Sequence, residues 1–323
     1  MQTMKAIVAA KYGSPDILGL VEIEKPVPKD HEILVKVHAT TVNVGDTRMR
    51  SFTVPAIAWL PARIALGFRK PRNPIFGMEL AGEVEAIGKA VKRFQVGDQV
   101  IASTMKSNFG AHAEYKCLPE DGAVAIKPAN MTYEDAATLS IGANTALHFL
   151  REGKIGRDMK VLIIGASGSI GTFAVQLAKY FGAEVTGVCS AANIEMVKSL
   201  GADRVIDYTQ GDYTKNGETY DIVFDTVLKT TFKQCKNLLM KRGCYLTAGP
   251  LALRPYYQMT TGKKVIGGGA VLTTEKLEFL IELCESGRLR PVIDRFYPLE
   301  RTAEAHRYVD QGHKKGNVVI NVK

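Results

Sequence analysis

The feature that most constrains this chain is an apolar run that turns through three glycines into a helical pattern. The run reads Val161-Leu-Ile-Ile-Gly165-Ala-Ser-Gly168-Ser-Ile-Gly171. The apolar residues that follow keep the spacing of a helix packed on a sheet: Ile170, Phe173, Ala174, Leu177 and Ala178. Such a strand-to-helix turn lets backbone N–H groups approach a pyrophosphate at the helix N-terminus. We predict a dinucleotide site; the alternative is a structural turn, because glycine clusters also mark ordinary turns.

The end of the next predicted strand, Glu184–Cys189, bears on which dinucleotide binds. An NAD-binding chain normally has Asp or Glu there to accept from the ribose 2′-hydroxyl. Here Ser190-Ala-Ala-Asn193 follows, so no carboxylate repels a 2′-phosphate, and Ser190 and Asn193 can donate to one. We therefore favour NADPH over NADH. The same two residues could instead cap the helix expected over 194–200.

Length and charge set wider bounds. A chain of 323 residues suggests two domains, and the net charge of +9 suits an anionic cofactor. The basic residues stand in short scattered groups such as Lys241-Arg242 and Lys314-Lys315, which is typical of a solvated surface. We therefore expect a small-molecule substrate and disfavour nucleic acid as a partner.

Neither the cysteines nor the first residues of the chain indicate secretion. Five cysteines lie far apart without a C-x-x-C motif, which fits buried thiols rather than a zinc knuckle or a disulfide framework. The first residues contain no apolar signal region. The most hydrophobic segment, Val54 to Phe68, contains Pro55, Pro61 and Arg63 and is too short to span a bilayer. We expect a cytoplasmic enzyme with no membrane partner.

The pattern of short strands changes along the chain. Residues 1–124 contain short β runs separated by turn residues, and residues 125–267 alternate strands with helices, which is typical of a doubly wound parallel sheet. Residues 268–323 contain two helices and a final strand, Asn317–Val322. This order predicts an α/β protein in which a nucleotide-binding domain is inserted into a β-rich domain.

A series of ordered motifs resembles the medium-chain dehydrogenase/reductase superfamily, and most of all its zinc-independent quinone oxidoreductase branch. The matching stretches are Thr41-Val-Asn43-Val-Gly-Asp46, Gly77-Met-Glu79-Leu-Ala-Gly82, Gly110-Ala-His-Ala-Glu-Tyr115, Gly142-Ala-Asn-Thr145-Ala, the glycine turn, Ile206-Asp-Tyr208 and Gly316-Asn317-Val-Val. The resemblance implies a GroES-like catalytic domain over 1–124 and 268–323, a Rossmann domain over 125–267, and a cofactor in the cleft between them. It also implies a homodimer formed by the Rossmann edge strands, for which Lys264–Gly268 is the candidate.

The resemblance also bears on metal. Zinc-containing members have a cysteine where this chain has Asn43 and a histidine where it has Met78, and the four-cysteine structural zinc loop is absent. An amide or a thioether does not replace thiolate or imidazole on zinc. We therefore expect no zinc.

The absence of zinc restricts the chemistry. Reduction of a simple ketone forms an alkoxide, whose conjugate acid resembles water and has a pKa of about 15.7. Reduction of a quinone or enone forms a delocalised anion whose conjugate acid has a pKa of about 10. The protein therefore has to stabilise this anion by roughly 8 kcal/mol less. A few hydrogen-bond donors can then suffice. We expect hydride transfer from a nicotinamide to a quinone or an α,β-unsaturated carbonyl, with solvent or a weak donor supplying the proton.

Residue roles follow from the matched motifs. Asn43 is implied to lie beside the nicotinamide and to hydrogen-bond the acceptor, with Asp46 orienting it; alternatively Asn43 only holds its loop. Thr145 is implied to face the nicotinamide or its ribose, or else to cap a helix. The other implied cofactor-binding residues are Gly165, Ser167, Gly168, Ser169, Ile170, Gly171, Ser190, Asn193, Tyr208, Val227, Gly249, Gly267, Gly268 and Asn317.

Two groups of residues carry weaker expectations. The segment from Phe52 to Phe68 is expected to border the substrate cleft, or else to be a loop on the surface of the β-rich domain. His38, His112 and His306 have no acid or nucleophile nearby in sequence and are expected to be core or surface histidines.

Two other functions stay open at this point. One is a nucleotide-binding scaffold with little turnover, since some zinc-free relatives are lens crystallins or bind RNA. The other is a zinc-free alcohol dehydrogenase that acts on simple carbonyls.

Overall fold

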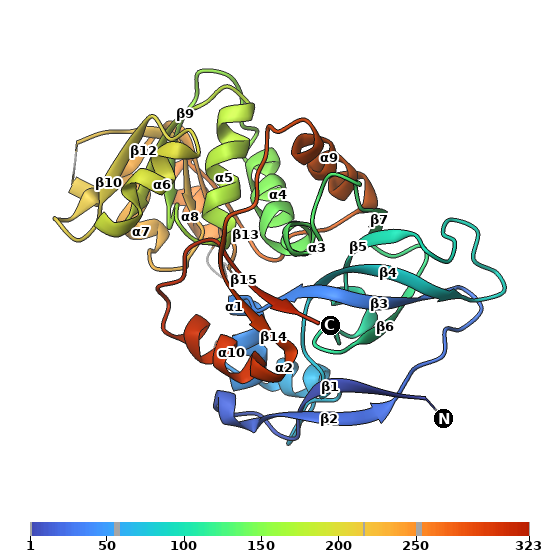
Figure 1. Cartoon of the computed structure of the whole chain (residues 1–323). Coiled ribbons are helices and arrows are strands. Elements are labelled where there is room, and N and C mark those ends of the chain that lie inside the picture. Colours follow the sequence, from blue (N-terminus) through green and yellow to red (C-terminus); the bar gives the residue numbers. More distant parts are fainter. Residues whose placement is uncertain (1, 55–58, 216, 250–253, 323) are drawn as a thin grey trace. The chain divides into compact units, whose positions relative to one another are not determined.

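The computed structural model describes residues 2–54, 59–215, 217–249 and 254–322. Contacts divide the chain into two compact units. Unit 1 comprises residues 1–141, 273–285 and 293–323, and unit 2 comprises residues 142–272 and 286–292. The predicted mixed α/β class is confirmed by the strands and helices of both units (Figure 1).

Unit 2 is built on a parallel sheet of six described strands in the order β10-β9-β8-β11-β12-β13. Numbered from β8, this is the order 3-2-1-4-5-6 of a dinucleotide-binding Rossmann sheet, and it reverses direction between β8 and β11. The strands are β8 (Lys160–Ile164), β9 (Glu184–Cys189), β10 (Arg204–Asp207), β11 (Tyr220–Asp225), β12 (Leu239–Thr247) and β13 (Lys264–Gly267).

Helices connect these strands, and α4 and α5 lie side by side (Figure 1). The predicted helix after the glycine turn is α5, and Gly182 follows it with a φ of +83°, a left-handed conformation that glycine adopts without strain. The described helices of unit 2 are α4 (Asn144–Glu152), α5 (Ser169–Tyr180), α6 (Ile194–Ser199), α7 (Phe232–Cys235) and α8 (Arg254–Thr261).

Unit 1 is built mainly on antiparallel strands. Its larger sheet has the order β14-β15-β3-β4-β5-β7, with β6 paired to β3, and β1 pairs separately with β2. The described strands are β1 (Thr3–Ala9), β2 (Leu18–Glu24), β3 (Glu32–Thr41), β4 (Glu79–Ile87), β5 (Gln99–Ser103), β6 (Tyr115–Pro119), β7 (Val124–Ile126), β14 (Ile293–Pro298) and β15 (Asn317–Asn321).

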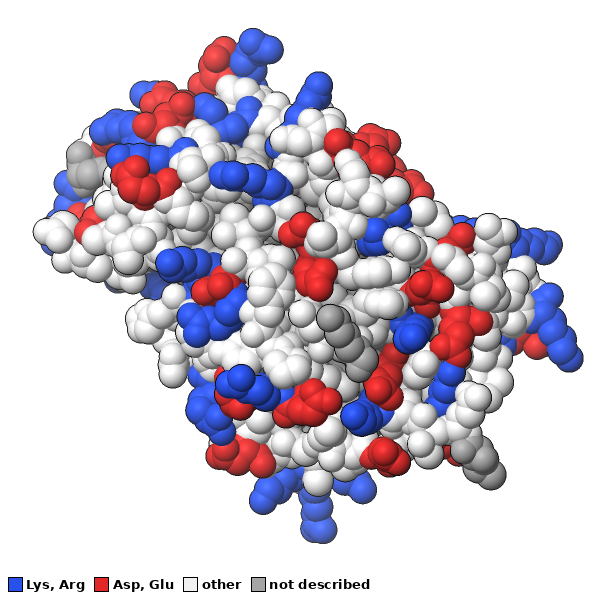
Figure 2. All heavy atoms as spheres, viewed as in Figure 1, with Lys and Arg blue, Asp and Glu red and all other residues white. Residues whose placement is uncertain are grey.

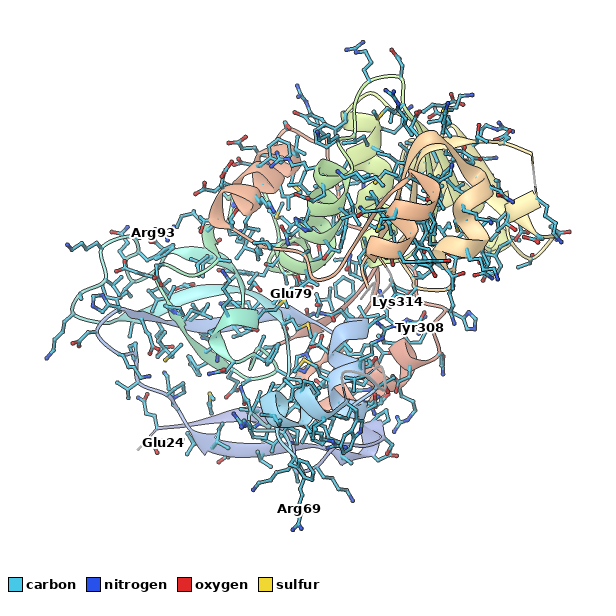
Figure 3. The ribbon with its side chains drawn as sticks, turned by 180° about the vertical axis from the view of Figure 1, so that it is seen from behind. Glu24, Arg69, Glu79, Arg93, Tyr308 and Lys314 are labelled. Atoms are coloured by element: carbon cyan, nitrogen blue, oxygen red, sulfur yellow. The ribbon has the colours of Figure 1, made fainter. Side chains whose placement is uncertain are left out.

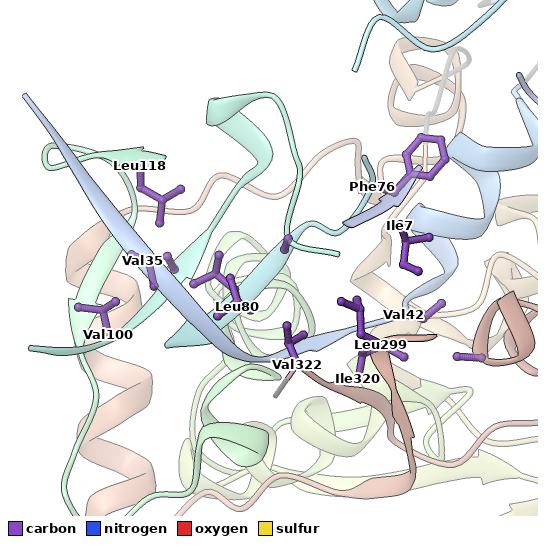
Figure 4. Packing of buried hydrophobic residues seen from close by; sticks show 14 of the residues in the cluster. Ile7, Val35, Val42, Phe76, Leu80, Val100, Leu118, Leu299, Ile320 and Val322 are labelled. Carbon is purple, nitrogen blue, oxygen red and sulfur yellow. The ribbon is translucent and has the colours of Figure 1, made fainter. Parts of the chain in front are cut away.

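Apolar side chains from both ends of the chain fill the core of unit 1. Val35 and Leu80 come from the central strands, Ile320 comes from β15, and all three belong to one buried cluster (Figure 4). The described helices around this core are α1 (Val44–Ser51), α2 (Trp59–Leu66), α3 (Tyr133–Ala136), α9 (Thr274–Glu285) and α10 (Thr302–Asp310). The C-terminal residues therefore complete a core that the N-terminal strands begin.

The boundaries of the units differ from the predicted ones. Unit 1 extends to residue 141 rather than to 124, because β7 pairs with β5 and α3 packs on β3 and β4. Residues 268–272 and 286–292, which were expected in the β-rich domain, belong to unit 2, whereas residues 273–285 lie in unit 1, where α9 packs on β7. Strand β14, which the sequence did not reveal, pairs with β15 at the edge of the larger sheet.

Candidate functional site

The glycine turn connects β8 to α5, at the carboxyl end of the sheet where the strand order reverses. Gly165 has a φ of +79°, and a Cβ there would lie 2.4 Å from Cγ1 of Val227. A Cβ on Gly171 would lie 2.1 Å from the carbonyl oxygen of Gly165. Gly171 therefore allows α5 to lie close to the end of β8, and Gly165 leaves room for Val227, which follows β11.

Gly168 differs from the other two glycines. It is the N-cap of α5, it provides no side-chain capping bond, and its backbone is extended with a φ of −84°. Among the described residues, a Cβ there would contact only the carbonyl oxygen of Gly165, at 3.5 Å. The start of α5 is thus open to an anion, which the positive end of the helix dipole attracts. Ser167, Ser169 and Ile170 lie on the same turn and are half-buried.

Three of the expected cofactor-binding residues meet beside this turn. Asn193 is buried, and its Nδ2 donates to Oγ of Ser167 at 3.3 Å and to Oγ of Ser190 at 3.1 Å. Its Oδ1 is buried and has no hydrogen-bond partner in the described part of the chain. Asn193 is the N-cap residue of α6 but makes no side-chain capping bond, so the alternative capping role is not observed for it.

Two further residues lie around the end of β9. The backbone N–H of Tyr208 donates to the carbonyl of Cys189 at 3.1 Å, and the Tyr208 side chain is exposed. Asp207 accepts from Oγ1 of Thr209 at 2.8 Å, and hydrogen bonds from the backbone of Thr209 and Ala191 help to hold its pKa below the usual range. A carboxylate therefore stands beside the 190–193 loop, where the sequence indicated none.

The strand ends on the other side of β8 are organised by Asp225, which sequence reasoning missed. This buried carboxylate accepts from the backbone N–H groups of Val227, Leu228 and Thr230. It holds Leu228 in a left-handed conformation with a φ of +57°. A Cβ on Gly249 would lie 2.6 Å from Leu228, so Val227 and Gly249 line the same loop.

The remaining expected cofactor residues are spread over both units. Gly267 and Gly268 lie at the end of β13, and Thr145 is buried in the first turn of α4, whose N-cap Ala143 has no side-chain cap. Asn317 is buried at the start of β15 in unit 1. Asn144 was missed: its Oδ1 is buried and has no hydrogen-bond partner among the described residues.

In unit 1, Asn43 and Asp46 form a reciprocal capping box at the start of α1. Oδ1 of Asn43 accepts from the Asp46 backbone at 3.1 Å, and Oδ2 of Asp46 accepts from the Asn43 backbone at 3.0 Å. A backbone N–H can only donate, so the carboxamide oxygen must face it. Nδ2 of Asn43 is consequently directed elsewhere; it is buried and has no partner in the described residues. Asn43 both holds its loop and presents a donor.

Asp46 lies beneath this loop in a fully buried position. Its Oδ1 accepts from the Gly77 backbone at 3.2 Å, and burial raises its pKa to about 7. Met78 follows Gly77, and a Cβ on Gly45 would lie 2.9 Å from the Met78 sulfur and 2.8 Å from Oδ1 of Asn43. The thioether and the amide thus lie next to each other.

Glu79 and Lys314 (Figure 3) were missed as site residues. Oε1 of Glu79 accepts from Oγ1 of Thr41 at 2.6 Å, and Oε2 accepts from the Ile141 backbone at 2.8 Å. Burial raises the Glu79 pKa to about 8, although the hydrogen bonds from Thr41 and Ile141 lower it; the Asp46 charge adds a smaller rise, and Lys314 opposes it. Burial also lowers the pKa of Lys314 to about 8. Because the same strand also contains Glu83 and Glu85, no local signal distinguishes Glu79.

Two of the three histidines lie in the interior of unit 1, as expected. Nε2 of His112 lies 3.0 Å from the Thr41 carbonyl, which can only accept, so Nε2 carries a proton. Burial lowers the His112 pKa to about 4, and the His306 ring packs edge-on against it. His38 stacks on Tyr133.

The residue types at the Asn43 loop do not fit a zinc ion, since neither carboxamide nor thioether is an ordinary zinc ligand. Within residues 2–54, 59–215, 217–249 and 254–322, no group of three or more His, Cys, Asp or Glu side chains is placed to hold a metal. The glycine turn, by contrast, fits a dinucleotide, because Gly168 leaves the helix start open.

The segment from Phe52 to Phe68 forms helix α2 over Trp59–Leu66, while Pro55 lies outside the described residues. A groove of about 940 Å³ in unit 1 is lined by Tyr12, Met49, Leu66, Phe76 and Lys116 among others. Leu66 belongs to the Phe52–Phe68 segment, whereas none of the expected catalytic or cofactor-binding residues lines this groove. No helix in the described ranges is both long and apolar enough to cross a membrane.

Comparisons with known proteins agree with this architecture. Residues 29–128 match the alcohol dehydrogenase GroES-like domain, and residues 200–320 match a family described as zinc-binding dehydrogenase. The chloroplastic quinone-oxidoreductase homolog of Spinacia oleracea is 32% identical over 98% of both chains. The chloroplastic NADPH-dependent alkenal/one oxidoreductase of Arabidopsis thaliana is 30% identical over 98% of this chain and 79% of its own.

A solved structure gives the same result. The quinone oxidoreductase from Coxiella burnetii superposes with a TM-score of 0.89 at 28% identity and covers 100% of both chains. The predicted GroES-like and Rossmann fold is therefore confirmed. The resemblance seen in the motifs is confirmed too: this chain belongs to the medium-chain dehydrogenase/reductase superfamily, in its quinone-oxidoreductase-like branch.

Proposed function

We propose that the protein is a zinc-free, NADPH-dependent oxidoreductase that reduces a quinone or an α,β-unsaturated carbonyl. The observation that carries this proposal is the Asn43 loop, where the buried Nδ2 of Asn43 has no hydrogen-bond partner among the described residues. Zinc-containing members have a metal ligand at this position. The names of the spinach and Arabidopsis relatives support the acceptor classes.

We assign the following roles to the residues of the chain. The glycine turn and the start of α5 bind the pyrophosphate, and Thr145, Gly249, Gly267, Gly268 and Asn317 are proposed to lie along the remainder of the cofactor. A bound nicotinamide supplies a hydride. Nδ2 of Asn43 donates to the acceptor oxygen and stabilises the negative charge that develops there. Asp46 keeps the carboxamide oriented through the capping box.

The electron and proton balance restricts the acceptor. A quinone that receives a hydride becomes a hydroquinone anion and takes one proton from solvent. An enone receives the hydride at its β-carbon and a proton at its α-carbon. In both cases conjugation spreads the charge, so one or two amide donors can replace a divalent ion. A saturated ketone offers no such delocalisation, and we expect it to react far more slowly.

The preference for NADPH rests on the 190–193 loop. Ser190, Asn193 and Ser167 form a polar cluster without a carboxylate of their own, and Tyr208 lies beside it. Asp207 works against a 2′-phosphate, because its charge stands next to the same loop. We therefore propose a modest preference for NADPH, with NADH also accepted.

Purified protein tests the proposal directly. NADPH oxidation is measured with a panel of quinones, alkenals and matched saturated ketones, with and without a chelator, and zinc is measured by elemental analysis. We expect turnover of the conjugated acceptors that the chelator does not change. Stoichiometric zinc, or equal rates with saturated ketones, would contradict the mechanism. Cofactor binding without any turnover would favour a binding protein instead.

Two further expectations remain proposals. We propose a homodimer in which β13, an edge strand of its sheet, pairs with its counterpart; a monomer mass by light scattering at micromolar concentration would contradict this. A cytoplasmic location also stays a prediction, since both plant relatives carry chloroplastic names.

A further inference from the structure

Helix α2 of unit 1 presents its apolar side chains to solvent. None of the eight residues of α2, all of which are described, is buried. Trp59, Leu60 and Ile64 are 43%, 56% and 62% exposed, and Phe68, just beyond the helix, is 61% exposed. Leu60 and Ile64 are four residues apart on one face of the helix. Phe68 lies beyond Gly67, after the helix has ended, and its ring packs edge-on against Trp59. An apolar face of this kind marks an interaction site in a folded protein.

The one charged residue of α2, Arg63, packs on aromatic rings. Its guanidinium lies 3.7 Å from the ring centre of Phe52, which is buried, 4.8 Å from that of Tyr12 and 5.1 Å from that of Trp59. Its Nη1 donates to the Phe68 carbonyl at 2.7 Å. The hydroxyl of Tyr12 donates to the carbonyls of Leu66 and Gly67. Polar and cation–π contacts therefore attach α2 to unit 1 and leave the apolar side chains of Leu60 and Ile64 exposed to solvent.

The chain around α2 is basic and contains no acid. Residues 47–78 include six Lys and Arg residues and no Asp or Glu. Arg50 is paired with Asp310, but Arg69, Lys70 and Arg72 directly follow the apolar face and are exposed. Figure 3 shows Arg69 at the edge of unit 1 with its side chain directed away from the ribbon. Over most of the face drawn in Figure 2, by contrast, basic and acidic side chains are mixed.

We propose that α2 and the basic run Arg69-Lys70-Pro71-Arg72 dock on an anionic lipid bilayer surface. Apolar side chains that enter the headgroup region, flanked by Lys and Arg that attract anionic lipid, are the two signals that together give stable interfacial binding. The expectation of no membrane partner rested on the lack of a spanning segment, which surface docking does not require. Binding is measured without turnover, so it is independent of the proposed reaction.

Trp59 makes the test specific, because it is the only tryptophan in the chain. The full-length protein is titrated with vesicles of phosphatidylcholine alone and of phosphatidylcholine mixed with phosphatidylserine. We expect the emission of Trp59 to shift to shorter wavelength with the anionic vesicles, and lipids brominated on the acyl chain to quench it. High salt should weaken the effect, since it screens the attraction.

Matched variants locate the surface. Arg69→Gln with Lys70→Gln should weaken vesicle binding about thirtyfold, because each basic residue near an anionic leaflet contributes about 1 kcal/mol. Lys241→Gln with Arg242→Gln removes the same charge from an exposed pair in unit 2 and should leave binding unchanged. Ile64→Ser should weaken binding while Trp59 remains as the probe. The circular dichroism spectrum of each variant is compared with that of the wild type to check that the variant is folded.

Three results would overturn the proposal. The first is equal weakening by the two double variants, which would show a non-specific charge effect. The second is sedimentation with vesicles while Trp59 emission stays constant, which would place the contact elsewhere. The third is the same emission shift on raising protein concentration without lipid, which would identify a second copy of the chain as the occupant of α2.

Discussion

The glycine turn of unit 2 and the Asn43 loop of unit 1 are shaped by different parts of the chain. At the turn, backbone conformation and the lack of Cβ atoms at Gly165 and Gly171 set the geometry. At the loop, the carboxylates of Asp46 and Glu79 set it through hydrogen bonds to backbone and hydroxyl groups. A site whose geometry is set by the backbone tolerates few added atoms. A site whose geometry is set by carboxylate side chains changes its stability with charge substitutions and with pH.

The largest expected effect tests the backbone half of this comparison. Gly171→Ala places a methyl group 2.1 Å from the Gly165 carbonyl, so strand and helix must separate. We expect the free energy of unfolding to fall by about 3 kcal/mol or more, as for a severe overpacking change. Urea denaturation measures this.

Gly168→Ala is the matched control, because its methyl group meets only one atom, at 3.5 Å. It should lower the free energy of unfolding by only about 1 kcal/mol, because Ala is a poorer N-cap residue than Gly. It should also weaken NADPH binding, since the added methyl group projects where we expect the phosphate. A Gly171→Ala protein as stable as wild type would show that the turn is not constrained by its backbone.

The next effect concerns the donor of the Asn43 loop. Asn43→Ser keeps a good N-cap residue for α1 but removes the amide Nδ2. We expect kcat to fall about a hundredfold, the cost of losing one donor to a developing oxyanion. Melting temperature and NADPH affinity should stay close to wild type. If stability and rate fell together, or if the rate did not change, Asn43 would only hold its loop.

A pH effect sharpens the contrast further. Burial raises the Glu79 pKa to about 8, so between about pH 5 and pH 7 the folded protein keeps a proton that the unfolded chain has released. The free energy of unfolding therefore falls as pH rises through this window, by about 1 kcal/mol per pH unit from this group. Lys314, whose pKa is about 8, stays mostly protonated in the same window.

Glu79→Gln removes that proton and retains an oxygen to accept from the Ile141 backbone. Its curve of unfolding free energy against pH should be flatter than that of wild type between about pH 5 and pH 7. Urea titrations at stepped pH measure the two curves. Parallel curves would mean that Glu79 ionises as it does in water.

The smallest effect returns to unit 2. Asn193→Lys places an ammonium beside Ser167 and Ser190. We expect the ratio of kcat/KM for NADPH over NADH to rise at least about tenfold, because a hydrogen bond to a charged group is worth more than 1 kcal/mol. Asp207→Asn should raise the same ratio a few-fold by removing a nearby negative charge. An unchanged ratio in both variants would place the 2′-phosphate away from this loop.

The sequence predicted most of unit 2 because its signals are local. The apolar run before Gly165, the spacing after Gly171 and the alternation of strands and helices are all read within a few dozen residues. In unit 1 the short strands within residues 1–124 were predicted as well. Strand β14 was missed, since Ile293–Pro298 is an edge strand without a buried, alternating face.

The side-chain network of unit 1 could not be predicted in the same way. Glu79 bonds to Thr41 and Ile141, which lie 38 and 62 residues away. No local pattern shows that this carboxylate is buried, because the burial comes from tertiary packing. Asp225 was missed for a similar reason: its three backbone donors come from a loop whose conformation the carboxylate itself imposes.

The discontinuity of unit 1 has a consequence for synthesis on the ribosome. The sheet of unit 2 is complete once residue 267 has emerged, whereas β3 waits for β15, Asn317–Asn321, to pair with it. Until then a nascent chain would carry the complete sheet of unit 2 together with an incomplete sheet of unit 1 that has an open strand edge. Open edges invite pairing with other chains. Molecular chaperones would therefore be needed longest by the part of this protein that is translated first.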